Sequence, residues 1–341
     1  MHTGIVTISL VSSLCACQSG ASFAESYLYE IIAVIGIVLL ILNYRVGCQK
    51  NSALLEGFAK ATGPLLAKNF AWVADGVELK SSTLLSNPEE ITRLFEVESA
   101  NSFRLRLTGR KSARFATVAV STRRRQDFLA SALCALFWPE KDRFCLEIAL
   151  ADLIPRGILY VVRSRAAKKI LGEFEDMRRL CRRLNLPGLP ENLAAYSETE
   201  ELVNSVMDPY VLGKFASAGA VFESLEFTDC AGAEPGRGAV LRIFGSLSGS
   251  ETEQKDVLAI GLTIALRAAE YSPSQRTQDK LVENRKSFYA ERNKEKRDSA
   301  MEAEKAKKWE SMTEKEKQKH IEKEQNRANL KASRRMVVVK K

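Results

Sequence analysis

The longest apolar run of the chain lies near its N-terminus, where Ile31–Leu42 contains no polar side chain. Tyrosines stand on both sides of this run, at Tyr27, Tyr29 and Tyr44. A helix that crosses a bilayer needs about 20 mostly apolar residues, and aromatic residues gather at its two rims. The pattern therefore predicts a single transmembrane helix at residues 28–44.

A shorter apolar segment, Ile5–Cys17, precedes this helix and is diluted by threonine and serine. It is too short to cross a bilayer, and the small residues Ser19–Ala21 that follow it are typical of a cleavage site. We therefore expect a signal peptide at residues 1–21, which leaves a short lumenal stub at 22–27.

The charges that flank the transmembrane helix predict its orientation. Glu25 precedes it, whereas Arg45 and Lys50 follow it. Because positive residues stay on the cytosolic side of a membrane, we expect a lumenal N-terminus and a cytosolic C-terminus.

Beyond the transmembrane helix the pattern changes to short alternating runs, typical of strands, and to periodic runs, typical of helices. Strands are predicted at 103–109, 114–121, 143–150, 157–164, 220–227 and 239–246. Helices are predicted at 51–69 (one helix, or a pair broken near Gly63 and Pro64), 126–137, 165–184, 198–215 and 251–269. This order predicts a cytosolic α+β domain at 45–271, built from one or two small layers of sheet and helix.

The C-terminal segment differs from the rest of the chain in composition. Residues 279–335 lack proline and glycine, and lysine and glutamate recur at helical spacing. Large apolar residues are too sparse for a coiled-coil seam, so we predict a long, charged helical tail at 272–341. A break near Thr313 would divide it into two helices, and the sequence leaves that alternative open.

The formal charge of +9 belongs to this tail. Residues 271–341 hold 21 lysines and arginines against 12 aspartates and glutamates, whereas the preceding residues hold 30 of each kind. A basic segment held at a membrane surface favours a polyanionic partner. The alternative is a solvated helix that has no partner.

Candidate chemistry is scarce. The chain has two histidines, His2 and His320, so the predicted body contains no His-dependent triad and no His-metal cluster. Its seven cysteines have no paired spacing, which is typical of reduced, intracellular thiols. We expect no catalytic residue, no metal and no cofactor. An enzyme that uses only Asp, Lys or Cys is the alternative that composition leaves open.

Basic residues gather where no acidic residue interrupts them, between Glu98 and Asp127. This segment is either the polar face of an amphipathic hairpin or a patch that faces ribosomal RNA or lipid headgroups. The candidate ribosome or anion contacts, taken with those of the tail, are Arg104, Arg106, Arg110, Lys111, Arg114, Arg123, Arg124, Arg125, Lys305, Lys307, Lys308, Lys315, Lys317, Lys319, Arg334 and Arg335.

Several stretches resemble the calumin family of coiled-coil-domain proteins of the endoplasmic reticulum. They are "YEIIAVIGIVLLILNYRVGCQKNSAL", "LLAKNFAWV", "YVVRSRAAKKILGEFEDMRRLC" and the Lys/Glu-rich end, which with the element order cover roughly residues 27–341. The resemblance implies a non-enzymatic subunit of the PAT complex in the endoplasmic reticulum membrane. Its implied partners are an Asterix-like small membrane protein, the Sec translocon, the ribosome and nascent multipass membrane proteins.

One departure from the family affects calcium. Family members often carry a long acidic lumenal region that binds calcium weakly, and here the corresponding region is only about Ser22–Tyr27. We therefore expect no calcium site. The alternatives are a membrane-tethered scaffold that binds anionic lipid, and a calcium-handling protein of the endoplasmic reticulum.

Overall fold

The computed structural model describes residues 23–73, 92–128, 140–150, 157–229 and 238–312, together with positions 131, 136–137, 314–315, 317–319, 322 and 325. The expected signal peptide at 1–21 lies outside these residues. The chain divides into two units, Met1–Ser274 and Gln275–Lys341. The first unit contains the apolar N-terminal segment and an α+β body, and the second contains the long charged helix, so the predicted fold class is confirmed.

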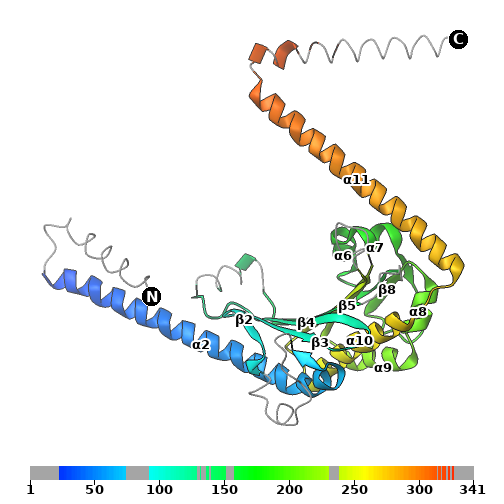
Figure 1. The fold of residues 1–341 in the computed structure, drawn as a ribbon. Helices are drawn as coiled ribbons and strands as arrows, with labels where there is room; N and C mark the ends of the chain where they lie inside the picture. Colours follow the sequence, from blue (N-terminus) through cyan, green and yellow to red (C-terminus); the bar gives the residue numbers. More distant parts are fainter. Residues whose placement is uncertain are drawn as a thin grey trace. The chain divides into compact units, whose positions relative to one another are not determined.

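Helix α2, Phe23–Asn69, runs without interruption from the apolar segment into the body (Figure 1). Among the described residues it is the one helix long and apolar enough to cross a membrane. Its apolar half is exposed, whereas Phe58 and Leu66 in its second half are buried. Of the two alternatives for 51–69, the structure has the single helix, and Pro64 lies inside it without a break. A proline cannot donate its helical hydrogen bond, but the surrounding turns are held by burial of Ala61 and Ala67.

The body is built on one sheet, whose described strands number ten and pair antiparallel, in place of the one or two small layers expected. Their order is β1–β3–β4–β5–β10–β9–β6–β8–β7, and β2 also pairs with β3. The bounds are β1 Trp72–Val73, β2 Glu96–Ser99, β3 Ser102–Thr108, β4 Ala113–Ser121, β5 Arg143–Leu150, β6 Leu159–Arg163, β7 Arg182–Leu184, β8 Leu193–Ser197, β9 Phe222–Thr228 and β10 Val240–Ser246. All six predicted strands are present, and β1, β2, β7 and β8 were not predicted.

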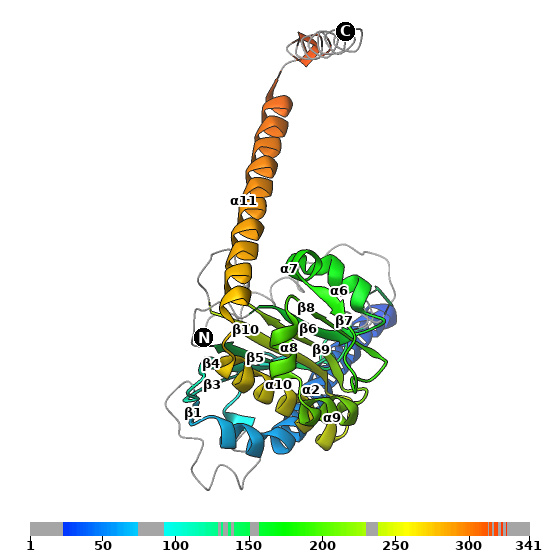
Figure 2. The ribbon, with the colours of Figure 1, turned by 90° about the vertical axis from the view of Figure 1, so that its right-hand side faces the viewer.

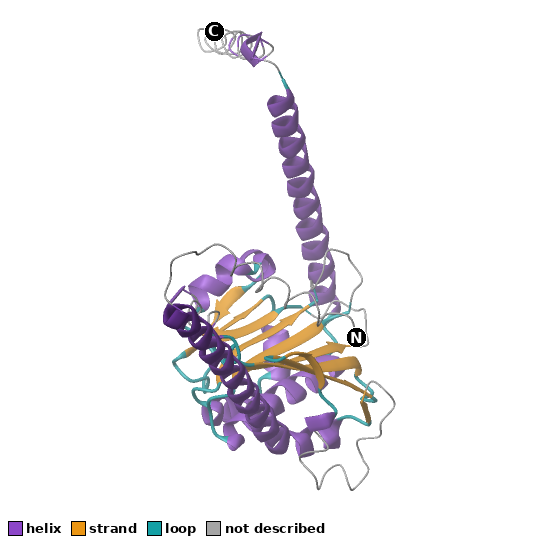
Figure 3. Ribbon diagram, turned by 90° about the vertical axis from the view of Figure 1, so that its left-hand side faces the viewer, coloured by secondary structure: helices purple, strands orange, loops and turns teal. Residues whose placement is uncertain are grey.

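The two faces of the sheet follow from the alternation of side chains along its strands. One register row joins apolar residues across six strands: Leu105, Val118, Leu146, Ile243, Leu225 and Val161. These side chains are buried. Helix α10, Glu251–Glu270, contacts β5, β9, β10 and α2, and Figure 3 shows helices packed along the sheet. The next row carries polar residues and faces the other way, so we call that side the polar face.

Shorter helices complete both layers. Helices α8, Glu200–Val206, and α9, Pro209–Ala218, contact α10. Helices α6, Ala167–Glu173, and α7, Glu175–Leu180, lie on the polar face near β6 and β8 (Figure 2).

Two predicted helices are each divided in two. The 165–184 helix breaks where Phe174 takes an extended backbone, with φ −104° and ψ 105°, and its last residues form β7. The 198–215 helix breaks at Asp208, whose side chain accepts a hydrogen bond from the Val211 N–H and begins a new helix ahead of Pro209. At Asp208, therefore, a local cap divides the predicted helix.

The second unit begins with helix α11, Gln275–Ser311. Its residues from 293 to 311 are exposed, as a helix without an apolar stripe requires. Thr313, where a break was considered, lies outside the described residues.

Candidate functional site

Helix α2 meets the body through three small or polar residues spaced four apart, which places them on one side of the helix. The Asn43 amide donates to the backbone carbonyls of Arg125 and Gln126 at 3.4 and 3.3 Å. At Gly47 a Cβ atom would lie 2.4 Å from the Gln126 nitrogen, so only glycine permits this approach. Asn51 completes the stripe. We call the contact of Asn43, Gly47 and Asn51 with the loop at 123–126 the α2 junction.

Asn51 is fully buried, and both its amide nitrogen and its carbonyl oxygen form hydrogen bonds across this junction. Its amide nitrogen donates to the carbonyls of Ala100 and Arg123 at 3.0 and 3.3 Å, and to Gln126 Oε1 at 3.2 Å. Its carbonyl oxygen accepts from Arg125 Nη1 at 3.0 Å. One side chain thus joins α2 to the turn before β3 and to the loop after β4.

Arg125 extends the junction to Asp142. The two side chains form a bidentate pair with nitrogen–oxygen distances of 2.8 and 2.6 Å. The Asp142 carboxylate also accepts from the backbone N–H of Arg123 at 2.9 Å. Burial acts to raise the pKa of Asp142, but these hydrogen bonds and the two positive charges outweigh it and lower the pKa. Arg125 is therefore part of the structural framework.

Arg123 and Arg124 also face acidic residues. Arg123 lies 3.7 Å from Asp142, and Arg124 lies 3.1 Å from Glu140. More than half of each arginine side chain stays exposed. Exposed pairs of this kind contribute about 0–1 kcal/mol, so they leave both arginines accessible to a partner.

Two further candidates, Arg104 and Arg106, lie on the polar face and pair with the neighbouring strand β2. Arg104 is 2.9 Å from Glu98, and Arg106 is 3.8 Å from Glu96. The stretch without acidic residues is therefore balanced by acids from adjacent strands, which only the sheet register reveals.

Of the three remaining candidates in the hairpin, Arg110 contacts other elements of the body, whereas Lys111 and Arg114 are exposed. Arg110 donates to the Leu262 carbonyl at 3.0 Å and lies over the Phe70 ring, so it ties β3 to α10. Lys111 and Arg114 are exposed, and neither forms an ion pair within the described part of the body.

The tail candidates are the most accessible ones. Lys305, Lys307 and Lys308 are exposed on α11, and Lys308 pairs with Glu304 at 2.7 Å. Lys315 and Lys319 are also exposed, Lys317 is half-buried, and Arg334 and Arg335 lie outside the described residues.

A buried polar cluster on the polar face was not predicted. The Tyr160 hydroxyl lies 3.1 and 2.9 Å from the two Asp176 oxygens, and the Thr228 hydroxyl donates to Asp176 at 2.8 Å. Beside them Arg242 pairs with Glu147 at 2.8 Å. Glu226 is buried, and this burial raises its pKa to about 7 despite the opposing charge of Arg242.

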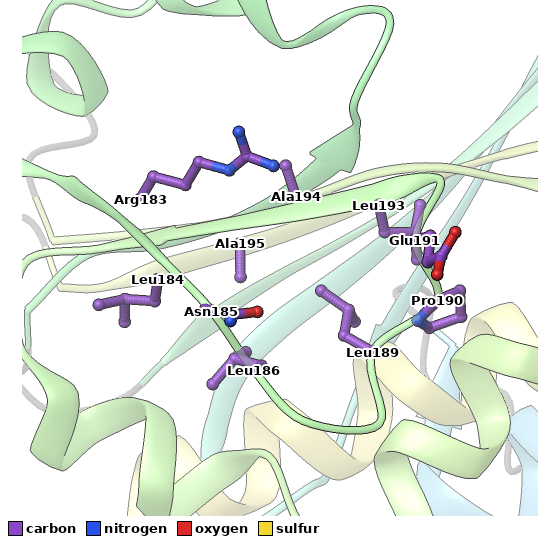
Figure 4. Close-up of a pocket in the computed structure, with 10 residues that line it drawn as sticks. All are labelled: Arg183, Leu184, Asn185, Leu186, Leu189, Pro190, Glu191, Leu193, Ala194 and Ala195. Carbon is purple, nitrogen blue, oxygen red and sulfur yellow. The ribbon is translucent and has the colours of Figure 1, made fainter.

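The described residues contain no group of three or more His, Cys, Asp or Glu side chains that is placed to hold a metal. A hollow of about 550 Å³ lies between β7, β8 and the loop that joins them (Figure 4). Leu184, Leu186 and Leu189 line it, and Arg183 and Glu191 are its charged residues. Glu191 is the one carboxylate among the residues that line it, and no Ser, Thr, Cys or Lys stands with it there as a nucleophile.

The match to known proteins covers both units of this structure. The sequence model described as PAT complex subunit CCDC47 matches residues 26–337, from the apolar half of α2 through the body and into the tail. The chain belongs to the PAT complex subunit CCDC47 family. The family predicted from the sequence is therefore confirmed.

Curated members of the CCDC47 family align with part of the chain. The PAT complex subunit CCDC47 of Danio rerio is 28% identical over 212 residues, which are 60% of this chain and 42% of that protein. The protein of the same name in Homo sapiens is 27% identical, with the same coverage. An uncharacterized protein of Arabidopsis thaliana is 24% identical over 234 residues, or 64% of this chain and 46% of that protein. The chain thus matches less than half the length of these relatives.

The junction residues of this CCDC47 family member were not predicted, although their spacing in the sequence indicates a contact. Asn43, Gly47 and Asn51 recur every four residues in a helix whose first half is apolar. A polar or glycine stripe at that spacing indicates close contact along one side of a helix. Arg125, which donates to Asn51, lies 74 residues beyond it, and Asp142, the partner of Arg125, lies 17 residues further on, so nothing local indicates either.

Proposed function

We propose that this chain is a non-enzymatic accessory subunit of the endoplasmic reticulum membrane that acts in a PAT complex with a small Asterix-like membrane protein. Helix α2 crosses the membrane with its N-terminus in the lumen, and the body and tail are cytosolic. The subunit assists the insertion and folding of nascent multipass membrane proteins at the ribosome-bound Sec translocon. The observation that carries the proposal is the family match over residues 26–337.

The distribution of charge supports a ribosome partner. The body up to Tyr271 is formally neutral, and the excess of +9 lies beyond it, where α11 exposes its lysines. A helix that contacts RNA phosphates through lysine releases counterions, so its binding weakens steeply as salt rises.

Client yield tests the proposed role directly. Depletion of the protein in its own cells should lower the yield of multipass membrane proteins and leave secreted proteins unchanged. Re-expression of the full chain should restore the yield. Equal yields of both classes after depletion would contradict the insertion role.

Ribosome sedimentation tests the tail. The detergent-solubilised full chain should co-sediment with ribosomes at low salt. Replacing Lys305, Lys307 and Lys315 by Gln should weaken this binding, and each lost phosphate contact should reduce the slope of log affinity against log salt by roughly 0.7–0.9. Replacing Lys111 and Arg114 by Gln removes exposed charge from the body and should weaken the binding less, if the tail is the main contact.

The outcome also separates the proposal from the lipid-scaffold alternative. Juxtamembrane basic residues bind anionic lipid with comparable salt dependence, so salt alone does not distinguish the two partners. Binding to anionic liposomes without binding to ribosomes would favour the scaffold.

A further inference from the structure

Strand β7 ends the sheet on the side opposite β1 and β2. Its three residues, Arg182–Leu184, pair with β8 and with no other strand of the described residues. The backbone N–H and C=O groups on its outer side are therefore left out of the ladder, as at any sheet edge. An edge of this kind can accept an extended peptide as an added strand.

The buried row of the sheet continues to this edge and ends at the hollow. Val161 pairs with Ala195, and Ala195 pairs with Leu184. Leu184 is half-buried and lines the hollow of about 550 Å³ together with Leu186 and Leu189. A strand added beside β7 would place every second side chain on this same face, next to Leu184. The hollow therefore offers space for an apolar side chain at that position.

The loop that closes the hollow is held in one conformation by its own residues. Pro187 and Pro190 restrict its backbone, and Gly188 takes φ 89°, a conformation that favours glycine. At the end of the loop the Ser164 N–H donates to the Asn192 carbonyl at 2.8 Å. The hollow is therefore preformed, and a ligand that enters it has little ordering of the loop to oppose binding.

The chain around β7 is basic, although the body as a whole is neutral. Residues 165–184 hold seven lysines and arginines against three aspartates and glutamates, and these three acids already contact groups of the body. Arg182 and Arg183 are exposed, and neither forms an ion pair within the described part of the chain. Charge complementarity at this edge therefore favours a peptide that carries acidic residues.

The apolar and the basic side chains of this edge face opposite ways. Arg183 pairs with Tyr196 in the register row of the polar face, and Figure 4 shows it on the other side of the strand from Leu184 and Leu189. On the polar face α7 contacts β8 and exposes Arg178. A peptide that alternates apolar and acidic residues would thus meet the hollow with one face and these arginines with the other.

The charges also decide which strand can pair here. Charged residues on an edge keep the edges of two copies of a protein apart, and a second β7 would bring two further arginines against Arg182 and Arg183. At the opposite edge of the sheet, Glu96 and Glu98 of β2 are compensated by arginines of β3. The uncompensated charge of β7 therefore excludes a second copy of this strand and still accepts an acidic one.

We propose that β7 and the hollow form a docking site for an extended acidic segment of a partner protein, which adds to the sheet beside β7 and places an apolar side chain in the hollow. Backbone hydrogen bonds hold the segment along the edge, and Arg182 and Arg183 select its acidic residues. The site needs neither the apolar half of α2 nor the tail, so its failure would leave the proposed function untouched.

A synthetic peptide tests the site against the full chain in detergent. The probe has about nine residues that alternate leucine and glutamate, carries fluorescein, and is followed by fluorescence anisotropy. We expect saturable binding. A probe with alanine in place of leucine should bind roughly tenfold more weakly, because it leaves the hollow unfilled. Equal affinity of the two probes would remove the hollow from the site and overturn the proposal.

Two N-methylated probes distinguish strand addition from simple attraction of charge. Methylation of the leucine nitrogens removes the backbone donors along one edge of the peptide, and methylation of the glutamate nitrogens removes those along the other edge. Since only one edge of an added strand can face β7, one probe should lose affinity by roughly tenfold and the other should keep it. Two N-methylated probes of equal affinity would show that the peptide does not bind as a strand.

Charge reversal in the protein locates the contact. Arg183→Glu should weaken binding of the unmodified probe by roughly tenfold, because it sets a carboxylate against the glutamates of the peptide. The matched control, Lys255→Glu, makes the same change of charge at an exposed position of α10 and should keep the wild-type affinity. An equal loss in both variants would mean that net charge alone attracts the peptide, which overturns the proposal.

Nucleic acid is the other class of partner that exposed arginines attract, and a labelled single-stranded RNA of about twelve uridines tests it. Its affinity for the full chain should be the same with and without Arg183→Glu. An RNA affinity that falls with Arg183→Glu, while the affinity of the peptide does not, would assign this edge to nucleic acid instead.

Discussion

At the scale of single residues, Asn51 forms more hydrogen bonds to the body than Asn43 or Gly47 does. Replacing it with Leu removes the donor to the Ala100 carbonyl. It also removes one partner of the Arg123 carbonyl, which keeps the Arg125 N–H, and one partner of the Arg125 side chain, which keeps Asp142. We expect Asn51→Leu to lower the free energy of unfolding by about 1–3 kcal/mol for each buried group left unsatisfied, measured by denaturation of the detergent-solubilised chain.

The control for this substitution is Asn69→Leu. Within the described part of the chain, the Asn69 amide bonds the Leu65 carbonyl one turn earlier in its own helix, at 2.8 Å. A loss for Asn51→Leu no greater than that for Asn69→Leu would contradict the role assigned to Asn51.

Glu226 gives the body a pH dependence of definite sign. Burial raises the pKa of its carboxyl from 4.5 to about 7. The folded state therefore binds the proton more tightly, so the stability that this proton confers is complete below pH 4.5 and is lost as pH rises toward 7. Glu226→Gln should flatten this fall and stabilise the body at pH 8, as measured by thermal unfolding at a series of pH values.

The matched control is Glu191→Gln, which changes an exposed carboxylate in a loop. It should keep the pH dependence of the wild-type chain. An unaltered profile in Glu226→Gln would show that the carboxyl does not titrate in this range.

The sequence names the basic residues of the hairpin correctly but not their surroundings. Arg104 and Arg106 acquire Glu98 and Glu96 through pairing of β2 with β3, and Arg125 acquires Asp142 from β5's leading turn. Composition between Glu98 and Asp127 shows an uninterrupted positive segment, because the compensating charges come from chain segments on either side of it.

At the scale of elements, replacing two glycines of α2 by alanine should change the stability of the protein in opposite directions. Gly47→Ala places a methyl group 2.4 Å from the Gln126 nitrogen and should push the loop away from the helix. Gly57→Ala meets nothing within 4 Å and should stabilise the helix by up to about 1 kcal/mol, because alanine is the better helix former.

Denaturation of the two single variants checks this pair. Gly47→Ala should lower the free energy of unfolding despite the gain in helix propensity, and Gly57→Ala should raise it. Equal stabilisation by both substitutions would mean that α2 does not pack against Gln126 as closely as the structure has it.

Local patterns locate six strands and most helices. They fail where the conformation of a residue or a strand depends on contacts with distant parts of the chain. The apolar stripe from Arg165 to Leu184 continues through Phe174, which the fold places in an extended conformation so that its ring packs 5.7 Å from that of Tyr160. Strand β8 has the plain sequence Leu193–Ser197, and it is a strand because β6 and β7 pair with it on both sides.

At the scale of the whole molecule, the proposed topology has a simple test. Arg45 and Lys50 follow the apolar run, and positive residues stay in the cytosol. Protease added to intact microsomes should therefore remove an epitope placed after Lys341. Protection of that epitope until detergent is added would reverse the orientation.

The separation of charge between the two units was predictable because it depends on composition alone. Residue counts place the excess of +9 beyond Tyr271, and the chain divides after Ser274. The single wide sheet was not predictable in the same way, because β1, β2, β7 and β8 are short strands that exist only through their neighbours.

Because α2 is one continuous helix, a tilt of its apolar half moves its other half with it. From Tyr44 to Asn69 the helix rises about 38 Å, with no hinge at Pro64 and with the junction bracing its outer side. If the apolar half crosses the membrane as proposed, a 10° change in its tilt would displace the far end of the helix by about 7 Å. Lipid thickness, or a partner helix that leans on the apolar half, would in this way set the position of the body over the membrane.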